Sequence, residues 1–177
     1  MLIRKAISKD AEKIARNNVL LAKESENTDI EYEKTLEGVK SLINDEMKGF
    51  YLVAEENGEI IGQVMVTYEW SDWRAKQIWW LQSIYVEKKW RRKEIMKALL
   101  NEIEQIAASK GIVALRLYVH ERNAEAIKAY ENIGMKKAPY IIYEMKLWLS
   151  SQNKISPFYF NCLPIYNCIS YLETSAP

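Results

Sequence analysis

A strand followed by a basic turn and a helix constrains the fold of this chain most. Residues 77–86 are rich in aromatic and β-branched side chains, which favour a strand. Apolar residues at helical spacing predict a helix over residues 94–109, with Gly111 close to its end. Residues 112–119 favour another strand. Because a strand, a helix and a strand follow one another, we expect a crossover that returns the chain to the same sheet.

The segment before this crossover predicts antiparallel strands. Asn57-Gly58 stands between apolar runs over residues 50–54 and 60–66, and this dipeptide is the strongest short-range signal for a tight hairpin. The other expected elements are a strand over residues 2–7, helices beginning at Ser8 and spanning 32–47, a helix over 124–132 and a strand over 141–147. This order predicts an α/β (α+β) fold with a mixed, mostly antiparallel sheet flanked by helices.

The length and composition are typical of one soluble domain. The chain has 177 residues, of which 49% are hydrophobic and 28% charged, enough to bury a single core. We expect a domain over residues 1–149 and a tail over residues 150–177. The net charge is +1, so no overall field favours nucleic acid or an anionic membrane as a partner. The first residues lack the apolar run of a signal peptide, so we expect a cytoplasmic location.

The tail is aromatic and uncharged over residues 155–172. It contains Pro157, Pro164, Asn161 and Asn167, which are unfavourable in a helix that faces lipid. We therefore expect a tail that packs on the domain or is poorly ordered, with no membrane partner. A role in a homodimer contact, or at a membrane surface, is the minor alternative.

The basic turn contains Arg91, Arg92 and Lys93, just before the helix over residues 94–109. The free N–H groups in the first turn of a helix point at any anion placed there, and basic side chains add charge. This arrangement suits a pyrophosphate. A cluster of Lys and Arg is, however, more often a solvated surface, so the turn alone does not decide between the two.

The residues around this turn resemble the signature of the GNAT acetyltransferase superfamily. The first part is Ile84-Tyr85-Val86 followed by residues 90–100, and the second is residues 115–119 followed by Asn123, Ala126, Tyr130 and Gly134-Met135. Two linked motifs in the same order and spacing are far more specific than either alone. The resemblance extends over residues 2–147, which is most of the chain.

The resemblance implies a co-substrate and a reaction. In that family the strand over residues 84–86 splays from its neighbour and pairs with the pantetheine arm of acetyl-coenzyme A, while residues 91–96 bind the pyrophosphate. The implied cofactor-binding residues are Ile84, Tyr85, Val86, Arg91, Arg92, Lys93, Glu94, Ile95, Met96, Lys97, Asn123 and Tyr130. Tyr130 also matches the residue that protonates the departing thiolate. We expect acetyl transfer to a primary amine of a small molecule or peptide, by direct attack in a ternary complex, without a metal.

Glu94 departs from the family pattern, which has glycine at this position. A carboxylate beside a pyrophosphate repels it. In one interpretation the Glu94 side chain points to solvent, to Arg91 or to Lys97, and the cofactor binds more weakly. In the other, binding of the cofactor is lost, and the domain is a catalytically silent relic or a sensor. Glu94, together with Gln82 in place of an acid, also supports an alternative function, a non-catalytic module that binds coenzyme A or a protein partner.

The general base is less well defined by the sequence. Many family members have an acid where this chain has Gln82, which cannot take a proton. Glu69, and after it Asp72, are the candidates to act through a water molecule, although an amine that arrives neutral needs no base. A pocket for the amine is one interpretation of the nearby aromatic residues, and the sheet core is the other; these are Tyr68, Trp70, Trp73, Trp79 and Trp80.

Overall fold

The computed structural model describes residues 1–145. Residues 1–137 form one compact unit, and the described residues 138–145 belong to a second. The first unit contains a five-stranded sheet in the order β1-β2-β3-β4-β5. Its strands are β1 (Leu2–Lys5), β2 (Phe50–Glu56), β3 (Glu59–Ser71), β4 (Lys76–Val86) and β5 (Leu115–Leu117). Neighbours from β1 to β4 are antiparallel, and β4 and β5 are parallel, which confirms the predicted mixed sheet.

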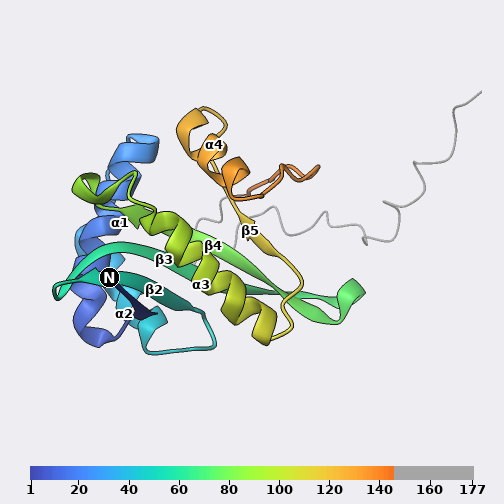
Figure 1. Cartoon of the computed structure of the whole chain (residues 1–177), viewed down its shortest axis with the longest axis horizontal. Helices are drawn as coiled ribbons and strands as arrows, with labels where there is room; N and C mark the ends of the chain where they lie inside the picture. Colours follow the sequence, from blue (N-terminus) through green and yellow to red (C-terminus); the bar gives the residue numbers. More distant parts are fainter. Residues whose placement is uncertain (146–177) are drawn as a thin grey trace, which may run out of the picture. The chain divides into compact units, whose positions relative to one another are not determined.

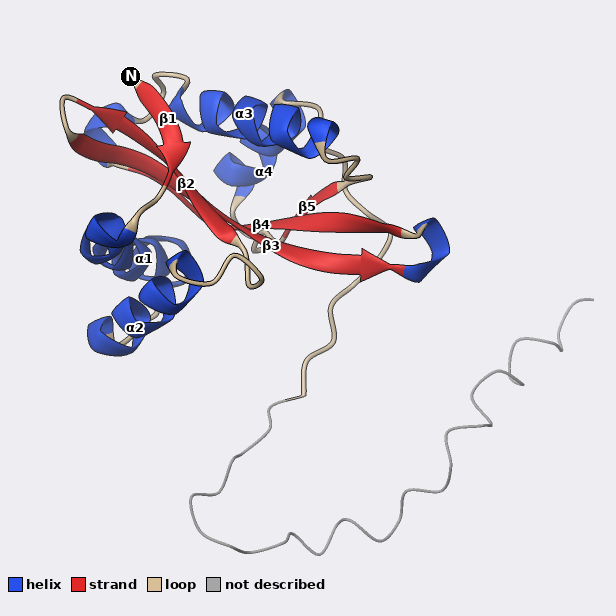
Figure 2. Ribbon diagram, turned by 90° about the horizontal axis from the view of Figure 1, so that it is seen from below, coloured by secondary structure: helices blue, strands red, loops and turns tan. Residues whose placement is uncertain are grey.

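Helices cover both faces of this sheet (Figure 1). They are α1 (Ala11–Glu26), α2 (Tyr32–Ile43), α3 (Ile95–Ser109) and α4 (Ala124–Asn132). Figure 2 shows α1 and α2 on one face and α3 on the other. The expected helix over residues 32–47 is too long, because α2 ends at Ile43. Asp45 Oδ1 accepts the Met47 N–H at 3.1 Å, and such a local bond competes with helix continuation.

The alternation of side chains along the strands builds two cores. Trp79 and Leu81 of β4 face α3 and pack with Leu99. On the opposite face, Tyr51 and Val53 of β2 pack with residues of α1 and α2. Successive side chains of a strand point to opposite faces, so β2 and β3 each supply residues to both cores.

The predicted hairpin at Asn57-Gly58 is confirmed. Both residues have positive φ, 51° and 79°, as a tight two-residue turn between twisted strands requires. None of the helices within residues 1–145 is long and apolar enough to cross a bilayer.

The strand expected over residues 141–147 is wrong for its described part. Residues 141–145 form no strand, and residues 146 and 147 lie outside the described chain. A strand needs a partner to bond its backbone groups, and none of the described residues pairs with this segment. The tail over residues 150–177 also lies outside the described chain, so the expectations for it remain predictions.

Candidate active site

A β-bulge interrupts β4 where the strand enters the candidate site. Tyr85 lies opposite Gln63 of β3, but Gln82 lies opposite Met65, so β4 carries one extra residue between these pairs. Ser83, within this bulge, has a φ of +49°, in the left-handed region. A bulge of this kind bends the strand and increases its twist.

Beyond the bulge, β4 has a free edge. Parallel pairing with β5 covers only Trp79 to Leu81, whereas β4 continues to Val86. The N–H of Glu87 bonds to Ile61 O at 3.0 Å on the β3 side. Since backbone groups alternate along a strand, those of Val86 and Ile84 point to the opposite edge, where β5 has already ended.

The turn before α3 presents a row of backbone N–H groups. Arg92 and Glu94 both have a φ of +61°, and α3 begins at Ile95. The first backbone hydrogen bond into α3 runs from Ala98 N–H to Glu94 O at 2.9 Å. For the amides of residues 92–97, no acceptor is found in the described part of the chain. Successive N–H groups in such a turn form a concave site for an anion.

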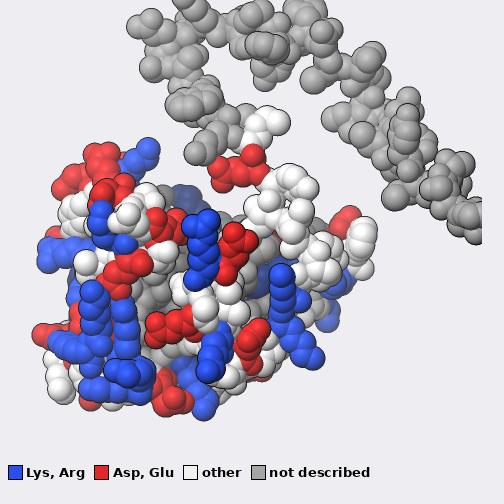
Figure 3. Space-filling view, turned by 90° about the horizontal axis from the view of Figure 1, so that it is seen from above, with Lys and Arg blue, Asp and Glu red and all other residues white. Residues whose placement is uncertain are grey.

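The side chains of this turn are mostly basic. On the face seen in Figure 3, Lys and Arg gather at the lower left, at the end of the molecule where this turn leads into α3. Lys93 Nζ lies 4.7 Å from the centre of the Trp90 ring. Glu94 Oε2 lies 3.1 Å from Lys97 Nζ, which is the geometry of the first interpretation of Glu94. The two apolar residues that follow, Ile95 and Met96, begin α3. Ile95 is buried, and Met96 packs against the core on this face of the sheet.

Arg91, predicted to bind the pyrophosphate, is held by the protein itself. Its Nε donates to Val86 O at 2.9 Å, and its Nη2 donates to Glu24 Oε2 at 2.6 Å. Burial acts to raise the pKa of Glu24, but the hydrogen bond and charge of Arg91, with those of Lys88, lower it below its usual value. Glu24 is therefore ionised at neutral pH and bound to two cations.

Asn123 and Tyr130 belong to α4. Asn123 Oδ1 accepts the Ala126 N–H at 3.1 Å and so caps the start of the helix. Tyr130 is half-buried two residues before the end of α4. Burial raises the pKa of Tyr130, so its hydroxyl keeps its proton across the neutral range.

The structure does not bring Glu69 to the bulge. Glu69 lies opposite Ile78 of β4, five residues before Ser83 or about 17 Å along the strand. Its Oε1 accepts from Arg116 at 3.1 Å, and Oε2 accepts from Trp80 Nε1. Asp72 is farther still, because it begins the 3-10 turn that links β3 to β4. Gln82, nearer the bulge, donates to Thr67 Oγ1 at 2.7 Å.

The aromatic residues of this region divide between core and surface. Trp79 is buried in the core and Tyr68 packs against it, whereas Trp70 is 65% and Trp73 is 91% exposed. Trp80 stacks on Tyr118 with ring centres 4.4 Å apart. Within the described residues, then, the expected group does not form one closed pocket.

Sequence reasoning missed a buried polar network beneath α1. Gln63 Oε1 accepts from Asn17 at 2.9 Å, and Gln63 Nε2 donates to Asn18 Oδ1 at 2.8 Å. Asn18 in turn donates to the hydroxyl of Tyr51 at 3.1 Å, next to Ser83 of the bulge. Gln63 could have indicated this network in the sequence, because it is polar in an otherwise apolar stretch of β3. The contact of Glu24 with Arg91 had no such signal, since 67 positions separate them.

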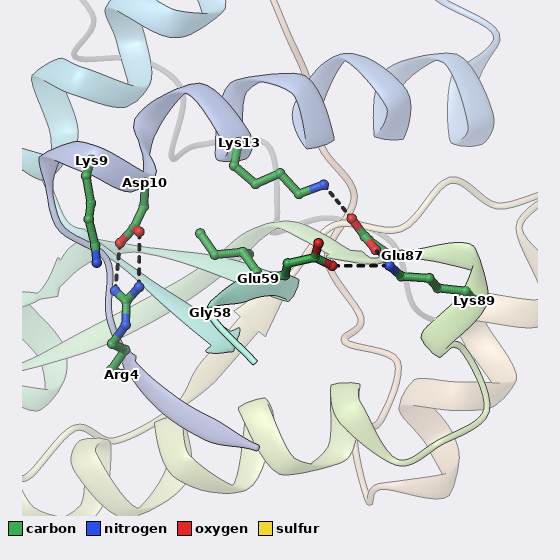
Figure 4. A pocket seen from close by; sticks show the side chains of 9 residues that line it. Arg4, Lys9, Asp10, Lys13, Gly58, Glu59, Glu87 and Lys89 are labelled. Atoms are coloured by element: carbon green, nitrogen blue, oxygen red, sulfur yellow. Dashed lines mark hydrogen bonds and ion pairs between the residues drawn. The ribbon is translucent and has the colours of Figure 1, made fainter. Parts of the chain in front are cut away.

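A polar hollow at the β2–β3 hairpin is separate from these residues (Figure 4). Its acids and bases pair with each other: Arg4 with Asp10, Lys13 with Glu87, and Lys89 with Glu59. Figure 4 shows each of these three pairs joined by a dashed line, whereas Lys9, which also lines the hollow, has no such contact with the other residues drawn. Residues 1–145 also contain no group of three or more His, Cys, Asp or Glu side chains that could hold a metal ion.

Curated proteins match parts of the chain. It is 28% identical over 75 residues to thialysine N-epsilon-acetyltransferase of Bos taurus, covering 42% of this chain and 44% of that protein. It is 39% identical over 56 residues to spermidine N(1)-acetyltransferase of Thermoplasma acidophilum, covering 32% and 35% respectively. The matched regions thus span less than half the length of these relatives.

A solved structure matches more completely. A possible acetyltransferase from Clostridium difficile is 40% identical, with a TM-score of 0.79, and the match covers 83% of this chain and 97% of that one. A sequence model of the Acetyltransferase (GNAT) family matches residues 13–135, which include the bulge, the free edge of β4 and the turn before α3. The chain therefore belongs to the acetyltransferase (GNAT) family.

Proposed function

We propose that this chain transfers an acetyl group from acetyl-coenzyme A to a primary amine of a small molecule or peptide. One observation carries the proposal: the free edge of β4 at Ile84 and Val86 is followed directly by the unbonded amides of residues 92–97. An extended ligand that ends in a pyrophosphate needs both in that order. Family membership supports the same reaction class.

The residues present suit acetyl-coenzyme A. Its pantetheine arm carries amide groups, which pair with free backbone groups as an added strand would. The backbone of Ile84 and the N–H of Val86 offer such groups, and the amides of residues 92–97 suit the pyrophosphate. Arg92, Lys93 and Lys97 add positive charge to the same turn. When bound, acetyl-coenzyme A supplies the acetyl group as a thioester.

The reaction proceeds by direct attack of the amine in a ternary complex. The attacking nitrogen must be neutral, the thioester carbonyl must be polarised, and the departing sulfur needs a proton or an equivalent stabilising donor. A backbone N–H at the free edge of β4 polarises the carbonyl. Tyr130 serves as the acid, since its raised pKa keeps the hydroxyl protonated. Asn123, capping the same helix, contacts the arm of the co-substrate.

We assign no side chain as an obligatory base. Glu69 is held by Arg116 and Trp80, and the register places it far along β4 from the bulge. Its role in the proposal is to order the acceptor side of the sheet with these two partners. The amine therefore binds neutral, or loses its proton to water before it attacks.

The acceptor is a small amine in this proposal. The names of two relatives identify thialysine and spermidine as their substrates, and both compounds are amines that carry additional charged groups. Glu24, near the end of α1, places a carboxylate oxygen 3.5 Å from the hydroxyl of Tyr85 on β4. Such a group favours a cationic acceptor over an anionic one.

Glu94 supports a second candidate, a non-catalytic module that binds coenzyme A or a protein partner. It places an acid and a left-handed φ where a phosphate must approach the backbone closely. The Glu94 carboxylate, however, pairs with Lys97 of α3 at 3.1 Å, which offsets its charge. This pairing favours the enzyme over the module.

One assay separates the two candidates. The full chain is incubated with acetyl-coenzyme A and a panel of amines that includes spermidine and thialysine, and the released thiol is measured. An enzyme releases thiol only when an accepted amine is present. Thermal stabilisation by acetyl-coenzyme A without turnover on any amine would identify the module instead.

A further inference from the structure

Glu24 connects the end of α1 to the segment that follows β4. Its Oε2 lies 2.6 Å from Arg91 Nη2, and its Oε1 lies 3.4 Å from Lys88 Nζ and 3.5 Å from the Tyr85 hydroxyl. An acid in the last turn of a helix faces the negative end of the helix dipole, which is unfavourable. The two cations offset this cost, so the carboxylate depends on them.

Arg91 holds groups that the co-substrate also needs. Its Nε occupies the carbonyl of Val86 at the free edge of β4, where the extended arm would pair. Its guanidinium lies 5.5 Å from the centre of the Tyr85 ring and precedes the unbonded amides of residues 92–97. A pyrophosphate at those amides carries more negative charge than one carboxylate. It therefore competes with Glu24 for the same guanidinium.

We propose that Arg91 exchanges Glu24 for the pyrophosphate of acetyl-coenzyme A, and that the freed Glu24 carboxylate binds an ammonium group of the acceptor. This inference rests on the proposed function. It specifies the acceptor class: an amine that carries a second, cationic ammonium group besides the nitrogen that reacts. It also sets the order of binding, with the co-substrate first.

The location of Glu24 suits this second role. Tyr85 follows the bulge by two residues, and its side chain points to the face of the sheet covered by α1, as Gln63 opposite it does. Once Arg91 is withdrawn, Glu24 retains one exposed lysine, Lys88, and the hydroxyl of Tyr85. A carboxylate with one weak cation partner and a neighbouring hydroxyl is a suitable site for an ammonium ion.

The test is Glu24→Gln, measured on both ligands. We expect the Kd for coenzyme A in calorimetry to fall about tenfold, because Arg91 is released. With spermidine as the probe amine, we expect KM to rise about tenfold, and kcat to stay within about threefold. Opposite effects on the two ligands are the signature, since a purely structural loss would weaken both.

Two control variants separate this exchange from a general charge effect. Glu26→Gln removes an acid from the same helical turn and should change neither constant. Glu94→Gln removes an acid beside the phosphate site, and should strengthen binding of coenzyme A without raising the KM for spermidine. Circular dichroism and a melting curve establish that each variant is folded.

A double-mutant cycle shows whether Glu24 acts through Arg91. In an Arg91→Gln background, Glu24→Gln should leave the affinity for coenzyme A unchanged. The exchange is overturned if Glu24→Gln still changes the affinity in this background, or if Glu24→Gln alone behaves like Glu26→Gln. In either case, turnover by the wild type would leave the proposed function intact. If neither wild type nor Glu24→Gln binds coenzyme A or acetylates spermidine or any other amine, the proposed function fails, and this inference with it.

Discussion

Gly62 of β3 packs so closely beneath Ile95 that a methyl group on its Cα would stand 2.9 Å from Ile95 Cγ2. Ile95 is the first residue of α3, and the unbonded amides of the anion site lie on either side of it. The same methyl group would also lie 3.3 Å from Leu99 Cδ1. The absence of a side chain at position 62 therefore lets the start of α3 rest on the sheet.

Gly62→Ala should consequently displace the beginning of α3. Ile95 is β-branched and buried, so it has little freedom to move aside. Overpacking of this kind costs about 1–3 kcal/mol, to be measured by urea unfolding. We also expect weaker binding of acetyl-coenzyme A, because the amides shift. Gly38→Ala, in α2 with no atom near the added methyl, is the control. Wild-type affinity in a Gly62→Ala variant would contradict this account of the turn.

Glu94→Gly should stabilise the fold and tighten binding of acetyl-coenzyme A. Glycine adopts a φ of +61° without strain, and the change removes an acid beside the phosphates. We expect a gain of about 1 kcal/mol in the free energy of unfolding. Arg92→Gly is matched to it, because Arg92 has the same φ but contributes a cation. Arg92→Gly should gain stability and bind acetyl-coenzyme A more weakly. If Glu94→Gly and wild type had equal affinities for acetyl-coenzyme A in calorimetry, the acid would have no effect on binding.

Tyr130→Phe should slow the chemical step and leave binding intact. Loss of a general acid reduces kcat about 100-fold or more, while the Kd for acetyl-coenzyme A stays near the wild-type value. Because burial raises the pKa of Tyr130, the wild-type rate should not fall through ionisation of this residue below about pH 10. Tyr32→Phe, in α2, is the control. A Tyr130→Phe variant with wild-type kcat would exclude this residue as the acid.

Asp10 should make the fold sensitive to acid. Burial acts to raise its pKa, but hydrogen bonds from Arg4 and from the Ile7 N–H, with the charge of Arg4, lower it below 3.8. A carboxyl with a lowered folded pKa stabilises the fold above its unfolded pKa. That stabilisation is lost as pH falls through the folded value. Urea unfolding at pH 7, 5 and 3 should show a steeper loss for wild type than for Asp10→Asn.

The size of this effect can be compared with that of an exposed acid. Asp10→Asn should cost about 1.5–3 kcal/mol at pH 7, because a partly buried bond to Arg4 loses its charge. Asp29→Asn should lower the free energy of unfolding by less than about 1 kcal/mol, because the Asp29 side chain beside Lys23 is 85% exposed. Parallel pH curves for wild type and Asp10→Asn would be incompatible with this role.

Local patterns were sufficient to predict most of the fold. Asn57-Gly58 specified its hairpin, and helical spacing gave α3 to within one residue. The helix over residues 32–47 was too long because the hydrogen bond from Met47 N–H to Asp45 is a local choice that apolar spacing does not encode. The short length of β5 depends on how far it follows β4, which is a tertiary property.

The candidate site was predictable only where its parts are contiguous. The basic turn is one such part, since strand, turn and helix follow each other in the sequence. The partner of Arg91 was not predictable. Glu24 lies on another helix, and the sequence does not distinguish it from Glu26 in the same helical turn. The distance between Glu69 and Ser83 along the sheet was likewise not predictable, because it depends on the register of β3 against β4.

The central claim is that backbone groups at the edge of β4 and at the start of α3 hold acetyl-coenzyme A. Titration of the ¹⁵N-labelled chain with acetyl-coenzyme A, followed by amide chemical shifts, tests it directly. We expect the largest changes to fall on Ile84, Val86 and residues 92–97 and to saturate together. Shifts centred instead on the polar hollow around Lys9 and Lys13, or no saturable shifts at all, would contradict it.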